Sequence, residues 1–338
     1  MMMAITSWMI LLASAGLMAP LSVAAPPRSV ARHALLLVEN KGAHSLSIVD
    51  PATRHELARV TLSGITGHEV AASSDGRFAY APIYGNSGVG MPGTNGRTID
   101  VINLASRRLV GEIDLGRAVR PHCAVYGRDG LLYVTAELAD AIYIVNPRTR
   151  KVVGQISTEQ PESHMLAITR DGKRGYTANV GAGTVTALDI EARKPIAVIH
   201  VCKVLQRISL SADDRLAFTA DQKQPRIAAI DTSTNRVKTW ITVPDVAFGT
   251  RATPDGRWLL ATMPGVSKIA VVDLHTMRVA RTIDVPESPQ EILIPPRRHV
   301  AYISCDRSAE VAVLNLEDWK LETPIRVGRN DDGMAWAP

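Results

Sequence analysis

The sequence predicts an all-β fold, a seven-bladed β-propeller, because two landmarks recur along it. The first is a short apolar run, a turn carrying Asp-Gly or a near relative, and a second apolar run. Its leading position, here called the column position, returns every 42 residues from His122 to Asp332. The second landmark is an apolar run that ends in Asp or Asn before a short polar turn, and it occurs seven times. Four short apolar runs per unit of this length are the pattern of a propeller blade.

Each unit reads as four short strands separated by turns. Copies of the first to fourth strand are residues 208–210, 131–135, 184–188 and 195–199. Runs this short, bounded by Gly, Pro, Asp and Asn, indicate strands rather than helices. The Asp or Asn that ends the third strand, as in Asp50-Pro51, can bond its own backbone two residues on, and Pro presets φ at the next position.

The two ends of the repeat complement each other. The first unit begins at 34–38 without a first strand, and the last segment, 332–338, is a first strand with nothing after it. We therefore expect residues 25–338 to form one propeller domain. Its ring would close by pairing of the C-terminal strand with the N-terminal blade, which leaves no open edge between the first and last units.

Residues 1–24 are predicted to be a cleaved signal peptide. They carry no charged side chain, contain the apolar run 8–13 and end at Ser22-Val23-Ala24, a small-x-small pattern typical of a signal-peptidase site. Pro20 and several small residues interrupt the run, which makes it short for a membrane span. No later run reaches roughly 18 apolar residues, so we expect a periplasmic or secreted protein without a membrane span after cleavage.

Composition and missing motifs exclude several classes of function. The net charge is +5, but the basic residues are scattered and form no stripe with interleaved aromatics, so nucleic acid is not an expected partner. No strand-to-helix transition follows Gly88-x-Gly90, which argues against a nucleotide cofactor. The sequence contains no Cys-x-x-Cys-His, so no covalent haem is expected.

With these landmarks the chain resembles the YVTN-repeat β-propellers, the YncE-like exported proteins. The resemblance covers about residues 32–338. It rests on 132–136 (Leu-Tyr-Val-Thr-Ala) and 175–179 (Gly-Tyr-Thr-Ala-Asn), which look like degenerate versions of that family's tyrosine-valine-threonine-asparagine strand. The resemblance implies the fold and leaves the function open, because relatives of this architecture include lactonases, haem-binding nitrite-reductase propellers, dehydrogenase subunits and binding proteins.

Three histidines occupy the column position in consecutive units. They are His68, His122 and His164, each seven residues before a turn Asp, and we expect them side by side on one arc of the channel mouth. Three imidazoles converging from one side suit Zn²⁺ or Cu²⁺ and leave an open position for water or substrate. Such an ion could lower the pKa of a water or polarise a carbonyl. The sequence therefore predicts these histidines as ligands of a divalent transition metal.

The remaining column residues and their neighbours are candidates for other roles. The predicted catalytic set is Asp332 and Glu69, as base or supporting acceptor, with Arg207 to hold an anionic group. The predicted substrate-binding residues are Gln206, Phe248, Gln290 and Tyr84.

Tyr84 precedes the one large insertion in the repeat. This insertion, 85–96, is expected on the same face as the column residues, beside the blade of His68. A long loop over a site is often a lid or a binding loop. A tolerated surface insertion is the alternative interpretation.

Two functions remain open on the sequence. The first is metal-assisted hydrolysis or isomerisation of a small polar substrate, and the resemblance points to a lactone. The second is a non-catalytic periplasmic propeller that binds a small-molecule ligand or a protein partner with the same face. Polar residues also commonly line a wet channel, so the column can be explained without chemistry.

Overall fold

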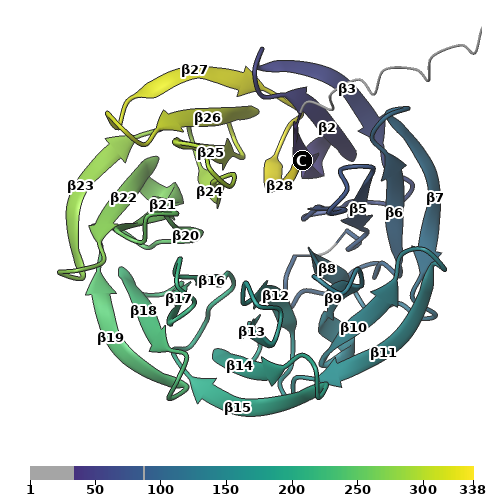
Figure 1. Cartoon of the computed structure of the whole chain (residues 1–338), viewed down its shortest axis with the longest axis horizontal. Coiled ribbons are helices and arrows are strands. Elements are labelled where there is room, and N and C mark those ends of the chain that lie inside the picture. Colours follow the sequence, from purple (N-terminus) through teal and green to yellow (C-terminus); the bar gives the residue numbers. More distant parts are fainter. Residues whose placement is uncertain (1–33, 87) are drawn as a thin grey trace, which may run out of the picture. The chain divides into compact units, whose positions relative to one another are not determined.

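The computed structural model describes residues 34–86 and 88–338. These residues form seven four-stranded antiparallel sheets arranged as blades in a ring (Figure 1). We call the region at the centre of the ring, between the first strands, the channel. The predicted all-β propeller fold and its seven blades are confirmed. The predicted signal peptide 1–24 and residues 25–33 of the predicted domain lie outside the described residues. No helix among the described residues is long and apolar enough to cross a membrane.

The first and second strands of each blade lie nearest the channel (Figure 1). The first strands are β28 (Asp331–Ala337), β4 (Ala71–Ala72), β8 (Pro121–Tyr126), β12 (Ser163–Ile168), β16 (Ser209–Leu210), β20 (Thr250–Ala252) and β24 (Pro289–Leu293). The second strands are β1 (Leu35–Asn40), β5 (Phe78–Pro82), β9 (Leu132–Ala136), β13 (Arg174–Asn179), β17 (Leu216–Ala220), β21 (Trp258–Met263) and β25 (Val300–Cys305).

The third and fourth strands lie farther out (Figure 1). The third strands are β2 (Ser45–Asp50), β6 (Thr98–Asn103), β10 (Ala141–Asn146), β14 (Thr184–Asp189), β18 (Arg226–Asp231), β22 (Lys268–Asp273) and β26 (Glu310–Asn315). The fourth strands are β3 (His55–Thr61), β7 (Arg108–Asp114), β11 (Lys151–Ser157), β15 (Lys194–His200), β19 (Arg236–Thr242), β23 (Arg278–Asp284) and β27 (Leu321–Arg326). Short 3-10 helices η1 (Lys41–Ala43), η2 (Glu137–Ala139) and η3 (Pro264–Val266) join second to third strands.

The ring closes between its two ends, as predicted. Strand β28 pairs antiparallel with β1, with Leu36 opposite Trp336 and Leu37 opposite Ala335. The closing blade therefore takes its first strand from the C-terminus and its other three from the N-terminus.

The polar turns use the chemistry that the sequence predicts. The Asp50 carboxylate accepts the backbone N–H of Ala52 at 2.9 Å, and Asp231 accepts that of Ser233 at the same distance. The residue before the fourth strand has a positive φ in six of the seven turns, for example 61° at Arg54, and in the seventh the positive φ is at Trp319, two residues before β27. The side-chain bond helps to hold a backbone that most residues avoid.

Apolar residues of the second and third strands pack between neighbouring blades. Leu37 of β1 and Ile48 of β2 are fully buried, and they belong to one cluster with Ile83 and Ile102 of the next blade. Burying one such side chain stabilises the fold by about 1.5–3 kcal/mol. The core therefore consists of the interfaces between blades, and the polar residues of the first strands face the channel.

Some first strands lose regular pairing at the column position. The register of β8 with β9 shifts between Pro121 and Ala124, and that of β24 with β25 shifts between Pro289 and Ile292. Such a bulge breaks the strict alternation of side chains between the two faces of a sheet. Residues that directly follow the column position can therefore also face the channel.

Candidate functional site

The three column histidines lie together, as the repeat predicts. The ring centroids of His122 and His164 are 3.6 Å apart, and those of His68 and His122 are 5.1 Å apart. His122 and His164 lie at the starts of β8 and β12, and His68 lies three residues before β4, on the face that carries the loops between second and third strands. We call this side the loop face. The opposite side, with the turns between first and second strands, is the turn face.

Two further residues of the loop face, Glu137 and Tyr84, contact these rings. We call these two residues and the three histidines the imidazole cluster. Glu137 of η2 lies with Oε1 2.5 Å from His164 Nδ1, and its Oε2 accepts the Tyr84 hydroxyl at 2.7 Å. The Tyr84 ring stacks on His68 with centroids 4.6 Å apart. The sequence interpretation missed Glu137. The available signal was its place in a loop between second and third strands, on the predicted face.

Burial keeps the first two imidazoles neutral. Desolvation lowers the pKa of His68 to about 3, although Asp332 acts in the opposite direction. Burial and the neighbouring His164 and His68 hold the pKa of His122 well below its ordinary range. His122 Nδ1 has no hydrogen-bond partner among the described residues. At neutral pH these two rings are therefore uncharged, polar and tightly packed.

The predicted Zn²⁺ or Cu²⁺ centre is wrong. The rings of His122 and His164 pack face to face at a tilt of 35°, and His164 Nδ1 is committed to Glu137. Among the residues that the structure describes, no three His, Cys, Asp or Glu side chains are arranged to hold a metal ion. A shared ion would need nitrogens converging at about 2.0–2.1 Å from one point.

The predicted catalytic residues also come together, in a second group that we call the ion cluster. Arg207 Nη2 lies 2.6 Å from Asp332 Oδ1 and 2.9 Å from Glu69 Oε1. Lys41 Nζ of η1 lies 3.1 Å from Asp332 Oδ2. The Arg207 guanidinium also lies over the Phe248 ring, 5.1 Å from its centroid. This arrangement brings two cations and two carboxyl groups into the channel wall.

The carboxyl groups of this region differ in charge state. Burial acts to raise the pKa of Asp332, but Lys41 and Arg207 hold it at about 2. Burial raises the pKa of Glu69 well above its usual range, against the attraction of Arg207. Glu291, which the sequence interpretation also missed, has its pKa raised by burial, against Arg207 and Arg251. Asp332 is therefore the firmly ionised carboxylate, while the other two retain protons more readily.

The sequence predicts the column histidines at the channel mouth, and the structure corrects this location. His122, His164 and Asp332 are only 2–4% exposed, and Glu69 and Arg207 are 4–6% exposed. These polar side chains are therefore buried inside the propeller.

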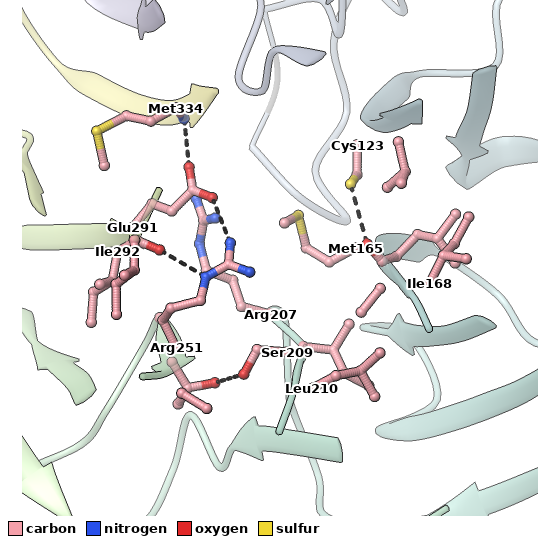
Figure 2. Close-up of a pocket in the computed structure, with 18 of the residues that line it drawn as sticks. Cys123, Met165, Ile168, Arg207, Ser209, Leu210, Arg251, Glu291, Ile292 and Met334 are labelled. Atoms are coloured by element: carbon pink, nitrogen blue, oxygen red, sulfur yellow. Dashed lines mark hydrogen bonds and ion pairs between the residues drawn. The ribbon is translucent and has the colours of Figure 1, made fainter. Parts of the chain in front are cut away.

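A cavity of about 520 Å³ lies on the turn-face side of these polar side chains. Its inner end carries Glu69, Arg207 and Glu291, and its outer end reaches the exposed turn residues Arg170 and Pro254. Figure 2 shows Arg207, Arg251 and Glu291 together on one side of this cavity. The opposite side is mostly apolar, with lining residues that include Val125, Met165, Leu166, Ile168 and Leu210.

The predicted substrate-binding residues do not line this cavity. Tyr84 is fully buried in the imidazole cluster, and Phe248 packs under Arg207. Gln290 donates from Nε2 to the carbonyl of Ser288 at 3.2 Å. Gln206 is partly buried at the column position.

The insertion 85–96 contacts the blade next to its own. The buried Arg120 donates from Nη2 to the Met91 carbonyl and from Nε to Asn95 Oδ1, both at 2.6 Å. Arg120 stands two residues before His122, so the insertion is anchored beside the imidazole cluster on the loop face, as predicted. It is therefore on the side of the ring away from the cavity.

Comparisons with known proteins found similar folds among solved structures but no matching family profile and no matching curated sequence. Among solved structures, Kuenenia stuttgartiensis hydrazine synthase is 14% identical with a TM-score of 0.67, covering 80% of this chain and 89% of that one. The dihydro-heme d1 dehydrogenase NirN in complex with DHE is 13% identical with a TM-score of 0.67, covering 93% of this chain and 77% of that one. Membership of the YVTN-repeat family stays a prediction.

The second comparison corrects the rest of the cofactor prediction. Because the sequence contains no Cys-x-x-Cys-His, it predicts no covalent haem. A similar fold belongs to an enzyme whose name includes dihydro-heme d1. The prediction of no covalent haem is therefore contradicted, and a missing attachment motif is no ground for excluding haem from a protein of this fold.

Proposed function

We propose that this chain is an exported propeller whose channel cavity binds a small, mainly apolar molecule. The observation that carries the proposal is the cavity of about 520 Å³, which joins apolar walls to a few polar groups at its inner end. Ligand sites are typically concavities of about 300–1,000 Å³ with this combination of linings. The dehydrogenase structure, solved in complex with DHE, supports the idea that this fold can hold a small molecule.

A neutral apolar dye tests this proposal. Nile red fluorescence should rise on binding to the wild-type protein. Ile168→Trp places a large ring in the cavity wall and should weaken binding at least about ten-fold, whereas Val266→Trp, on the exposed η3, should bind as wild type does. Thermal unfolding of both variants checks that they fold. Failure of the wild type to bind, or equal affinity in both variants, would contradict the proposal.

The dehydrogenase comparison adds a haem-type molecule to the ligands worth testing. Titration of hemin should then shift its Soret band with the wild-type protein but not with Ile168→Trp. An equal shift with both proteins would place any hemin binding outside the cavity.

A second candidate function is hydrolysis of a lactone or ester without a metal. Glu69 lies at the inner end of the cavity beside Arg207, and its raised pKa is the direction needed for a base that works near neutral pH. Glu69 would take a proton from water as the water oxygen bonds to the carbonyl carbon. Arg207 would stabilise the resulting oxyanion, and the departing ring oxygen would recover the proton.

Hydrolysis of dihydrocoumarin tests this candidate by absorbance. The rate should survive EDTA, and Glu69→Gln should lower it by at least about a hundred-fold, the scale of general-base catalysis. Glu287→Gln, at an exposed position, is the matched control. A rate unchanged by Glu69→Gln would eliminate Glu69 as the base.

The proposal that the protein is exported rests only on the signal-peptide pattern of residues 1–24. Full-length protein produced in a bacterium should be recovered outside the cytoplasm with Ala25 as its first residue. An intact N-terminus on the soluble protein would contradict cleavage after Ala24.

A further inference from the structure

The structure also indicates the chemical class of the ligand, an inference that rests on the proposed function of the cavity. The inner end of the cavity holds the guanidinium groups of Arg207 and Arg251. The N–H groups that these side chains leave without a hydrogen-bond acceptor determine which chemical group of a ligand can bind there. Arg207 is 6% exposed and lines the cavity, and its Nε has no hydrogen-bond partner among the described residues. A buried donor without a partner costs about 1–3 kcal/mol, so a ligand acceptor at this atom would remove a penalty.

Arg251 supplies a second set of donors at the same end. Its Nε donates to the Ile292 carbonyl at 3.1 Å. Its Nη2 lies 4.0 Å from Glu291 Oε1, which is beyond hydrogen-bond distance, and its side chain is 39% exposed. Figure 2 shows both guanidinium groups beside Glu291. A carboxylate is the group that guanidinium forks bind best, because each oxygen can accept from a separate N–H.

The carboxyl groups at this end do not cancel these cations. Arg207 is shared with Asp332 and Glu69, and Lys41 supplies a further positive charge to Asp332. Glu69 and Glu291 are buried carboxyls that retain protons more readily than Asp332. In their neutral form they add hydrogen-bond donors instead of negative charge. The inner end therefore presents guanidinium donors, and its positive charges outnumber its negative charges when Glu69 and Glu291 hold their protons, while the walls beyond it are apolar.

We infer that the cavity binds a carboxylate joined to an apolar body, with the carboxylate against Arg207 Nε and the Arg251 guanidinium. The apolar part extends along the wall formed by Met165, Leu166 and Ile168 towards the turn face. A cationic ligand, recognised instead by ionised Glu69 and Glu291, is the opposite arrangement and predicts the opposite ranking of probes.

Three probes with one apolar body separate these arrangements: 4-phenylbutanoate, 4-phenylbutanamide and 4-phenylbutylamine. Isothermal titration, or displacement of Nile red, measures their affinities for the mature protein. The carboxylate should bind at least about ten-fold more tightly than the amide, and the amine more weakly than either. Equal affinities of carboxylate and amide, or tighter binding of the amine, overturn the inference. Binding of Nile red in the cavity with no displacement by any probe also overturns it, while leaving the proposed function intact.

Two variants and a pH series locate the contact. Arg251→Gln should weaken the carboxylate about ten-fold and leave the amide within two-fold, and Arg215→Gln, on an exposed side chain, should change neither. Carboxylate affinity should fall as pH rises and Glu69 and Glu291 ionise beside Arg207, Arg251 and Asp332. Unchanged carboxylate affinity in Arg251→Gln, or affinity that rises with pH, contradicts the inferred contact.

Discussion

The two polar clusters of the channel lie at or directly beside the same column of the repeat but differ in how their charges are controlled. The imidazole cluster of His68, His122 and His164 is held by stacking and by one buried carboxylate, Glu137. The ion cluster is held by short contacts of Arg207 with Glu69 and with the ionised Asp332. Burial keeps His68 and His122 of the first cluster neutral by lowering their pKa, whereas in the second Lys41 and Arg207 lower the pKa of Asp332 and keep it ionised.

This difference shows what a repeated column can and cannot specify. Equivalent positions in neighbouring blades must lie close together, so proximity follows from the repeat. Charge state depends on residues from other elements, such as Lys41 of η1 and Glu137 of η2. The predictions below perturb one cluster at a time.

The largest effect is expected in the ion cluster. Arg207→Met keeps the bulk of the side chain but leaves Glu69 and Asp332 buried without their cation. We expect a loss of about 3–5 kcal/mol in the free energy of unfolding, measured in urea. Arg215→Met, whose partner Asp213 is 3.7 Å away at an exposed surface, should change it by less than about 0.5 kcal/mol. Similar stabilities of the two variants would show that the cluster is not a paired unit.

The imidazole cluster should set a pH dependence of stability. The pKa of His68 is about 3 in the folded protein, below its ordinary value of 6.5. Between these values the unfolded chain binds a proton that the folded chain does not, so stability falls as pH decreases through this window. The contribution should approach about 4 kcal/mol near pH 3. His68→Gln should flatten this fall and exposed His275→Gln should not, as measured by denaturation at each pH; parallel curves for wild type and His68→Gln would contradict neutral burial.

A smaller effect is expected from the carboxylate that holds the imidazole cluster. Glu137→Gln preserves shape, but it replaces one of the two carboxyl oxygens, of which Oε1 faces His164 Nδ1 and Oε2 accepts from the Tyr84 hydroxyl. We expect a loss of about 1–3 kcal/mol, since buried partners lose their bonds. Glu287→Gln at an exposed site serves as the control. Equal melting temperatures of both variants and wild type would remove Glu137 from the account.

The fold was predictable because each of its rules is local or periodic. Asp50 and its equivalents mark turns by their own side-chain bonds, and the ends of the repeat require pairing of β28 with β1. The proximity of His122 and His164 also followed from the repeat, because they occupy neighbouring blades. The contact of Arg207 with Asp332 did not, since the blades of β16 and β28 are not neighbours.

The geometry of the site was not predictable in the same way. Imidazoles in one column can converge on an ion or stack on each other, and packing by Tyr84 and Glu137 decides between these arrangements. Glu291 faces the cavity beside a register shift in β24, which strict alternation does not foresee. The cavity itself depends on the volumes of side chains from several blades, which no single repeat records.

The central claim is that the turn-face cavity holds a carboxylate against Arg207 and Arg251. A crystal structure of the protein soaked with 4-phenylbutanoate tests it most directly. We predict the phenyl ring against Ile168 and a carboxylate oxygen within about 3.2 Å of Arg207 Nε. An empty cavity at a saturating concentration of the probe, or a probe with its carboxylate turned to solvent, would contradict the claim.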